Sequence, residues 1–300
     1  MKVLLYYKYI VIKDPKQLMN EQRAFCEVRN IKGRILVSEE GINGTVVGEA
    51  EVMDEYIKFT EANPEIGPVE WKISDTEHEI FPKLRVVVRD EIVTLGLKKR
   101  EEDVRLEDKA DYIEPQELLD LYEKGEEFYI VDARNEYEAR IGKFKDAIYF
   151  DIDNFRDFPE AVKEIESLKD KPVVTYCTGG VRCEKASAFL KGKGFKNVRQ
   201  LHGGIQRYGD VVGGKNFEGT MYVFDRRVHV PVNTVNPTVI SECYHCGTKV
   251  ARFVNCCNAK CNKQIICCEA CDDRMNGGCS VECSQKRTAN AKRRLLYQNL

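Results

Sequence analysis

The chain has 300 residues, of which 43% are hydrophobic and 32% charged, and its 47 basic and 49 acidic side chains leave a net charge of −2. These values are typical of a globular chain of two or three domains, and they exclude a uniformly basic coat for nucleic acid but not a local basic patch. Because we find no apolar run near the ~18 residues of a membrane helix and no secretion signal, we expect a cytoplasmic protein with no membrane partner.

Residues 1–100 follow the pattern of a ferredoxin-like α+β sandwich. Apolar and β-branched runs predict strands at 3–12, 34–37, 45–47, 71–73 and 84–88, and helical spacing predicts helices at 15–29 and 50–62. The order β-α-β-β-α-β is that of the sandwich, which specifies no function by itself. We interpret the turn Glu39–Thr45 as part of a hairpin, with a direct role in a functional site as the alternative.

A charged stretch that is poor in apolar residues, 98–111, predicts a linker, and the pattern changes after it. Helices are expected from Pro115 and at 184–190. Apolar runs predict buried strands at 128–132, 172–176 and 197–201. Since strands alternate with helices, we expect a parallel sheet with helices on both faces in a second domain, residues 111–214.

The loop Cys177–Cys183 joins one of these strands directly to a helix. Glycines at 179 and 180 let the backbone curl so that the unpaired amides of the helix N-terminus face inward. With the fixed charge of Arg182, these amides should lower the pKa of Cys177 and hold it partly as the thiolate. The candidate catalytic residues are Cys177 and Arg182, in an active-site loop completed by Thr178, Gly179, Gly180 and Val181.

Three other residues of this region have weaker assignments. Asp132 and Arg134 follow a buried strand, and we interpret them as an ion pair that supports the loop from beneath rather than as direct participants. Cys183 lies at the first helical turn, where we favour a structural role over that of a thiol resolving an oxidised Cys177.

The Cys177-x4-Arg182 spacing is one residue tighter than the C-x5-R loop of Cys-based phosphatases and resembles that of the rhodanese family. Three further elements agree in order: Val131–Glu138, Gly142–Ala147 (with Lys143 at the usual His) and Gly194–Gly204. The resemblance covers 111–214 and implies a persulfide on Cys177, so a sulfurtransferase is one candidate function. A non-catalytic adaptor is another.

Over nearly its full length the chain resembles the rhodanese-domain tRNA uridine hydroxylases, through Ser38–Thr45, the loop Cys177–Glu184 and a cysteine-rich tail. This resemblance implies oxygen-dependent formation of 5-hydroxyuridine at the wobble position of tRNA, with the loop cysteine essential. It implies tRNA as the partner, and O2 and an unidentified reductant as cosubstrates. No organic cofactor motif is evident. The sulfurtransferase carrying a persulfide on Cys177 remains the alternative.

The third segment, residues 215–300, holds ten of the 13 cysteines, which in a reducing compartment predicts metal binding. Four close pairs supply the eight thiolates of two tetrahedral, structural zinc sites, in sequential or crossed pairing. Iron–sulfur ligation and disulfides are the alternatives. Cys257 and Cys267 are then spare, with replacement of a neighbouring ligand by either one as an alternative, and His245 is an alternative ligand within the first pair. The ligands are Cys243, Cys246, Cys256, Cys261, Cys268, Cys271, Cys279 and Cys283.

The end of the chain is basic, since residues 284–300 contain no acidic side chain. A separated basic stretch is a candidate contact for RNA phosphates, and a solvated tail is the alternative. A dibasic pair before the cysteines would extend the same track. The candidate RNA-binding residues are Arg226, Arg227, Lys286, Arg287, Lys292, Arg293 and Arg294.

Overall fold

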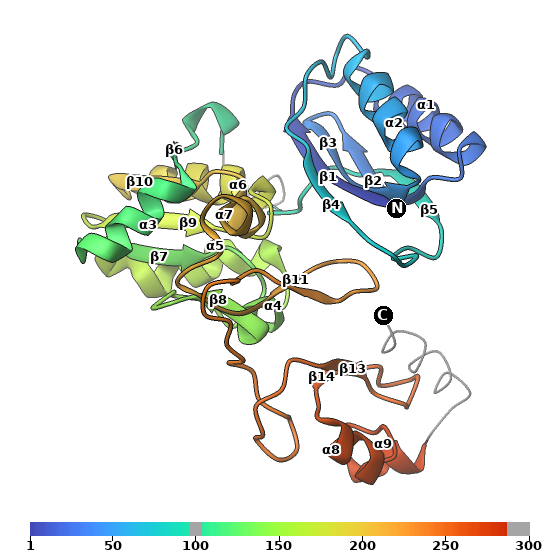
Figure 1. Ribbon diagram of the computed structural model, residues 1–300. Helices are drawn as coiled ribbons and strands as arrows, with labels where there is room; N and C mark the ends of the chain where they lie inside the picture. Colours follow the sequence, from blue (N-terminus) through green and yellow to red (C-terminus); the bar gives the residue numbers. More distant parts are fainter. Residues whose placement is uncertain (97–103, 287–300) are drawn as a thin grey trace.

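The computed structural model describes residues 1–96 and 104–286, which form an N-terminal sandwich, a central α/β body and a small cysteine-rich module (Figure 1). Residues 98–103 of the predicted linker, and the basic residues after Lys286, lie outside the described residues. Within the described ranges, no helix combines the length and the apolar character needed to cross a bilayer.

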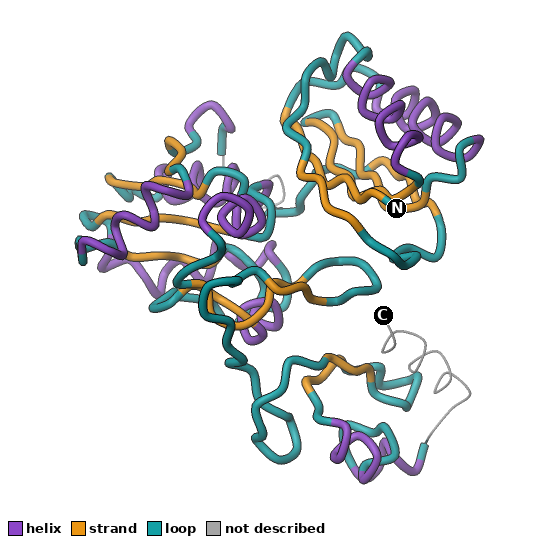
Figure 2. The backbone as a smooth tube through the Cα atoms, in the orientation of Figure 1, coloured by secondary structure: helices purple, strands orange, loops and turns teal. Residues whose placement is uncertain are grey.

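The N-terminal body is the ferredoxin-like sandwich that the sequence predicts. Its sheet has the strand order β4-β1-β3-β2-β5, in which β2 and β5 are parallel and the other neighbours antiparallel. Figure 2 shows both helices on one face of this sheet. The elements are β1 (Lys2–Tyr9), α1 (Pro15–Val28), β2 (Lys32–Ser38), β3 (Gly41–Gly48), α2 (Ala50–Glu61), β4 (Lys72–Asp75) and β5 (Leu84–Val88).

The two faces of this sheet have different partners because side chains alternate along each strand. Leu4, Tyr6 and Ile35 point to the helices and form the core with α1 and α2. Their sequence neighbours Leu5 and Tyr7 therefore point to the opposite face, which has no helix of its own and turns toward the central body.

The central body has the predicted parallel sheet, in the order β6-β10-β9-β7, with a hydrophobic cluster on each side. A separate three-stranded sheet in the order β12-β11-β8 accompanies it, because β11 pairs with both β8 and β12. Its elements are β6 (Asp111–Ile113), α3 (Pro115–Lys124), β7 (Tyr129–Asp132), α4 (Glu136–Ile141), β8 (Gly142–Phe144), α5 (Phe158–Ala161), β9 (Pro172–Tyr176), α6 (Val181–Gly192), β10 (Asn197–Leu201), α7 (Gly204–Val212), β11 (Phe217–Tyr222) and β12 (His229–Pro231).

The cysteine-rich module has little regular structure and a small core in which cysteines pack with Val254 and Ile265. Because so few apolar side chains are buried here, the module depends on other interactions for its stability. Its elements are β13 (Phe253–Asn255), β14 (Gln264–Ile266), α8 (Glu269–Arg274) and α9 (Val281–Gln285).

A fully buried ion pair between Asp132 and Arg134 joins three strands beneath the Cys177 loop. Both side chains have 0% exposure, and 2.6 Å separates an Arg134 nitrogen from Asp132 Oδ2. The Tyr176 hydroxyl donates to the same carboxylate at 2.6 Å, and Arg134 donates to the Gly142 carbonyl at 2.7 Å. The pair thereby links the ends of β7 and β9 to the start of β8.

Replacing Arg134 with Met should destabilise the protein by about 3–5 kcal/mol, because it leaves the buried Asp132 carboxylate without its cation. The measurement is the midpoint of urea unfolding followed by circular dichroism. Arg105→Met is the matched control, since Arg105 pairs with Asp108 in an exposed position and should contribute no more than about 1 kcal/mol. Equal midpoints for the two variants would contradict this assignment.

Candidate active site at the Cys177 loop

The Cys177 loop is held by backbone hydrogen bonds at both ends. The Gly180 amide donates to Cys177 Sγ at 3.1 Å, and Gly180 has φ +100°, a conformation that favours glycine. At the start of α7, the Ile205 amide donates to the Cys177 carbonyl at 3.0 Å. The sulfur of Cys177 is therefore fixed where β9 ends and α6 begins, facing the amides of the loop.

The Cys177 side chain is buried, with 0% exposure. Burial by itself would raise the pKa of this thiol, but the hydrogen bond from the Cys183 thiol, the charge of Arg182 and the loop amides together lower the pKa to about 6. Burial and the thiolate beside it raise the pKa of Cys183. The environment thus favours ionisation of the Cys177 thiol and keeps the neighbouring Cys183 thiol neutral, and the thiolate is the form of cysteine that can act as a nucleophile.

The partner of the Arg182 guanidinium is the carboxylate of Glu138. Its two terminal nitrogens donate to the Glu138 carboxylate at 2.6 and 2.7 Å, in a bidentate pair that is almost completely buried. The pair positions the guanidinium near Cys177 while offsetting part of its charge. Sequence reasoning missed Glu138, although it lies within the Val131–Glu138 element.

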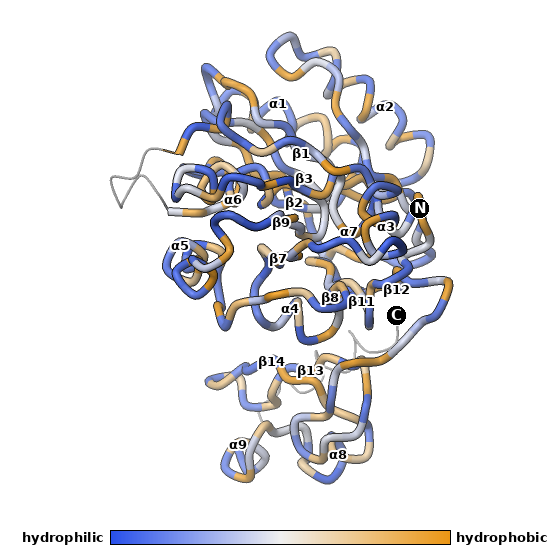
Figure 3. The backbone as a smooth tube through the Cα atoms, turned by 90° about the vertical axis from the view of Figure 1, so that its left-hand side faces the viewer, coloured by the Kyte–Doolittle hydropathy of each residue, from blue (hydrophilic) through white to orange (hydrophobic). Residues whose placement is uncertain are grey.

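The N-terminal sheet covers the loop directly. The Tyr7 hydroxyl donates to Glu184 and the Tyr9 hydroxyl to the Val181 carbonyl, both at 3.1 Å. A Cβ added at Gly180 would lie 2.8 Å from the Tyr7 hydroxyl oxygen. Figure 3 shows the same arrangement, with β1, β2 and β3 next to α6 and β9. A glycine is required at 180 by both its conformation and its neighbour.

A second connection between the bodies passes through Lys185, which is buried on α6. Its ammonium contacts Glu40 at 2.8 Å and Glu91 at 2.6 Å, and donates to the Val93 carbonyl at 3.0 Å. Glu40 lies in the two-residue turn between β2 and β3, so this turn contributes to the contact between the bodies. The turn predicted at Glu39–Thr45 is too long, because β3 begins at Gly41. Nothing in the sequence signals a pair between residues that are 145 positions apart.

A cavity of about 370 Å³ lies between the sheet and the loop. Tyr7, Asn43 and Thr45 line it from the sheet, and Cys177 and Thr178 line it from the loop. The Thr178 hydroxyl is buried and has no hydrogen-bond partner among the described residues, so it is available to a bound polar group. The exposed aromatic ring of Phe224, after β11, lines the same cavity.

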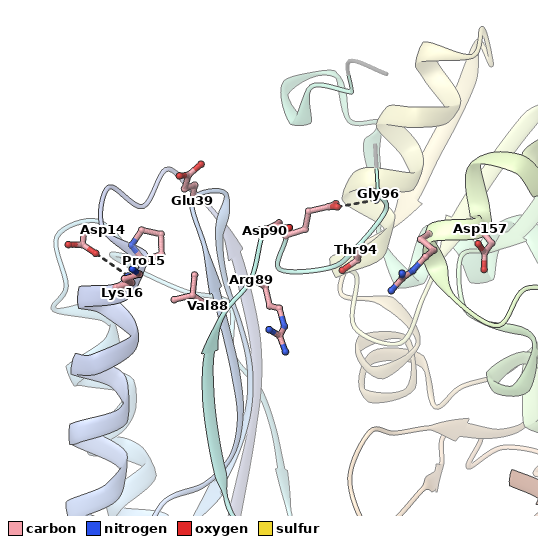
Figure 4. Close-up of a pocket in the computed structure, with 12 residues that line it drawn as sticks. Asp14, Pro15, Lys16, Glu39, Val88, Arg89, Asp90, Thr94, Gly96 and Asp157 are labelled. Atoms are coloured by element: carbon pink, nitrogen blue, oxygen red, sulfur yellow. Dashed lines mark hydrogen bonds between the residues drawn. The ribbon is translucent and has the colours of Figure 1, made fainter. Parts of the chain in front are cut away.

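A larger cavity of about 740 Å³ adjoins the first and shares with it Arg89, Glu91, Thr94 and Arg156. Figure 4 shows residues from both bodies on its walls, including Asp14 and Arg89 on one side and Asp157 on the other. The Cys177 site is therefore a composite of two bodies that is open toward a wider space.

The three predicted RNA-binding residues that the structure describes, Arg226, Arg227 and Lys286, do not line this cavity. Arg227 pairs with Asp225 at 2.6 Å, and the Arg226 backbone amide donates to the Ile80 carbonyl at 3.0 Å. Lys286 is exposed at the end of α9. Arg287, Lys292, Arg293 and Arg294 lie outside the described residues.

The eight predicted metal ligands form two tetrads with crossed pairing. Within each tetrad, the four sulfur atoms lie within 4.8 Å of one another, which fits the coordination of one metal ion by four thiolates. Cys257, Cys267 and His245 belong to neither tetrad, and none of the cysteines in the described ranges forms a disulfide. The tetrads are Cys243, Cys246, Cys268 and Cys271, and Cys256, Cys261, Cys279 and Cys283.

Family models match three successive parts of the chain: an UPF0176 acylphosphatase-like domain at residues 1–92, a rhodanese-like domain at 114–210 and a rhodanese C-terminal domain at 218–284. The chain is 46% identical to a protein of Cytophaga hutchinsonii over 94% of this chain and 89% of that one, and 44% identical to a protein of Bacillus licheniformis over 94% and 88%. Both relatives are named tRNA uridine(34) hydroxylase.

Among solved structures, a rhodanese-related protein from Thermoplasma volcanium matches 33% of this chain and 91% of its own, with 27% identity and a TM-score of 0.28.

Alkylation of Cys177 by iodoacetamide should increase with pH and level off above about pH 7, because the thiolate is the reactive form and the pKa of this thiol is about 6. Mass spectrometry of the Cys177 peptide measures the rate at each pH. In a Cys183→Ala variant, which lacks the neighbouring donor, the inflection should move to higher pH. An inflection in the wild-type protein near 8.5, the ordinary value, would contradict a stabilised thiolate.

Proposed function

We propose that this chain, which belongs to the tRNA uridine(34) hydroxylase family, hydroxylates the wobble uridine of tRNA at carbon 5 with O2. The observation that carries the proposal is 46% identity to a hydroxylase over 94% of the chain. The site supports it chemically, because a stabilised thiolate and an unpartnered hydroxyl line one cavity. A tRNA substrate places the enzyme in the cytoplasm.

In the proposed reaction, one oxygen atom of O2 enters the C5–H bond of uracil and the other leaves as water. The reaction consumes two electrons and two protons, which an external reductant supplies. The Cys177 thiolate adds to carbon 6, which places electron density on carbon 5 for reaction with O2, and departure of the sulfur with loss of the carbon 5 proton restores the ring. Transfer of oxygen from an oxidised Cys177 sulfur is the other route, and it also begins with the thiolate.

We assign supporting roles to the rest of the site. Arg182 holds a positive charge beside the thiolate, and the backbone from Thr178 to Val181 supplies the amides that stabilise it. A base must leave its stack to reach a buried sulfur, so the wobble nucleotide is flipped into the cavity. The three units proposed from the sequence, 1–100, 111–214 and 215–300, then act as the cover of the site, its catalytic body and a metal-stabilised module.

The metal that we propose for both tetrads is Zn²⁺, in a structural role. Four thiolates complete a tetrahedral zinc shell and leave no open position for a substrate. Because the module buries few apolar side chains, metal binding supplies a large part of its folding free energy.

A Cys177→Ser variant should form no 5-hydroxyuridine, because a serine hydroxyl is not ionised near neutral pH. The measurement is nucleoside mass spectrometry of tRNA incubated with O2, a reductant and the protein. Cys267→Ala is the matched control, since Cys267 lies outside the loop and both tetrads, and it should retain activity. Product formation by Cys177→Ser would reject the assignment.

The sulfurtransferase alternative is tested with the same proteins, thiosulfate and cyanide. Thiocyanate release by the wild-type protein, without formation of 5-hydroxyuridine from tRNA, would replace the hydroxylase by a persulfide carrier. If the protein is a hydroxylase, we expect formation of 5-hydroxyuridine from tRNA without release of thiocyanate.

The purified chain should contain two zinc ions, measured by inductively coupled plasma mass spectrometry. Cys243→Ser should reduce the content to one ion or fewer, whereas Cys267→Ala should keep both, because only Cys243 belongs to a tetrad. Equal zinc content in the two variants would contradict the ligand assignment.

A further inference from the structure

The helix-free face of the N-terminal sheet has three arginines, two on the neighbouring strands β2 and β5 and one directly after β5. Arg34 and Arg85 are paired in the register of these strands, so their side chains lie next to each other on one face. Arg89 follows the end of β5 and, being four residues after Arg85, returns to the same face. All three side chains are exposed.

The charges of these arginines are not neutralised within the protein. Across the described ranges, no side-chain hydrogen bond or ion pair joins Arg34, Arg85 or Arg89 to any other residue. Partial burial lowers the pKa of Arg34, and the charges of Arg85 and Arg89 lower it further. Three cations that repel one another without a counter-charge form a site that an anion would stabilise.

This arginine face continues into the cavity of the candidate active site. Arg34 and Arg89 line the 370 Å³ cavity that contains Cys177, and Arg89 also lines the 740 Å³ cavity next to it. Figure 4 shows the Arg89 side chain extending toward the space between the two bodies. The cationic groups are thus connected by one surface to the nucleophile.

The acidic side chains near this surface either are paired with other groups or lie at the larger cavity, and so they do not neutralise the arginines. The Glu91 carboxylate contacts Lys185 and accepts the amides of Leu95 and Gly96, so it is already bound. Asp14, Glu39, Asp90 and Asp157 line the larger cavity and not the smaller one. An anion is therefore favoured at the wall formed by Arg34 and Arg89 and disfavoured at the far wall of the larger cavity.

We propose that Arg34, Arg85 and Arg89 form a phosphate-binding track for the RNA nucleotides that flank the base entering the Cys177 cavity. Guanidinium groups bind phosphate oxygens in bidentate geometry. The exposed arginines lie on the β2–β5 side of the sheet, away from β1, whose tyrosines cover the loop, and single-stranded RNA can lie on such an exposed surface. The inference rests on the proposed function and specifies how the sheet binds the substrate. The three arginines of the track are separated in the sequence, so no cluster of basic residues indicates them.

The test measures binding, separately from hydroxylation, of a synthetic anticodon stem-loop RNA with uridine at the wobble position. Fluorescence anisotropy at a series of salt concentrations gives the affinity and its dependence on salt. Each of Arg34→Ala, Arg85→Ala and Arg89→Ala should weaken binding several-fold and reduce the slope of log affinity against log salt by about 0.7, the value for one phosphate contact to a single strand. Arg89→Lys should keep the slope, because it keeps the charge.

Lys58→Ala is the matched control, since Lys58 is an exposed cation on α2, on the opposite side of the same sheet. It should leave the slope unchanged. An equal loss with Lys58→Ala, unchanged slopes in all three arginine variants, or no binding by the wild-type protein would each overturn the inference.

RNA binding that depends on the arginines without any formation of 5-hydroxyuridine would support the track and reject the hydroxylase. Formation of 5-hydroxyuridine together with unchanged RNA binding by the three arginine variants would support the hydroxylase and reject the track.

Discussion

The ionised sulfur of Cys177 is the feature on which the rest of the site depends. A thiolate with 0% exposure is unstable unless fixed donors replace the water that it has lost. The loop amide of Gly180 and the thiol of Cys183 are such donors, and they are held by the junction of β9 with α6. The buried Asp132–Arg134 and Arg182–Glu138 pairs fix the backbone around this junction.

The N-terminal sandwich gives this loop an environment that the central body alone does not supply. Tyr7 and Tyr9 cover the loop, and Lys185 joins its helix to Glu40 and Glu91 of the first body. A buried ammonium between two carboxylates requires both bodies to be present, because either side alone would leave charges without partners. The cavity is therefore a product of the contact between the bodies, and a molecule bound in it would contact both.

The local pattern of the sequence was sufficient to predict most of the fold. Strand periodicity and helical spacing located the elements of the sandwich, and the alternation of strands and helices gave the parallel sheet. The short strands β8, β11 and β12 were not predicted, because three to six residues carry too little periodicity and their pairing is set by distant partners. Likewise the strand predicted at 3–12 ends at Tyr9. The Ile10 amide still donates to the Glu40 carbonyl in the register of β1 and β3, but the Ile12 amide donates to the Glu39 carbonyl, one residue out of that register.

The same difference between local patterns and contacts among distant segments applies to the residues of the site. A loop that is contiguous in sequence revealed Cys177, its glycines and Arg182, and the spacing of the tail revealed all eight members of the tetrads. Glu138, Lys185 and the cover formed by Tyr7 come from segments far apart in the chain, so no local pattern could identify them. The arginines of the sheet face were missed for a related reason: Arg34 and Arg85 become neighbours only through strand pairing.

The crossed order of the tetrads means that shortening the end of the chain affects both of them. Cys256 and Cys261 of the second tetrad lie between the two pairs of the first, and Cys268 and Cys271 of the first lie between the two pairs of the second, so the tetrads interlock. Loss of the last pair, Cys279 and Cys283, leaves all four cysteines of the first tetrad in the chain, but Cys256 and Cys261 then lose their partners inside the segment that the first tetrad closes.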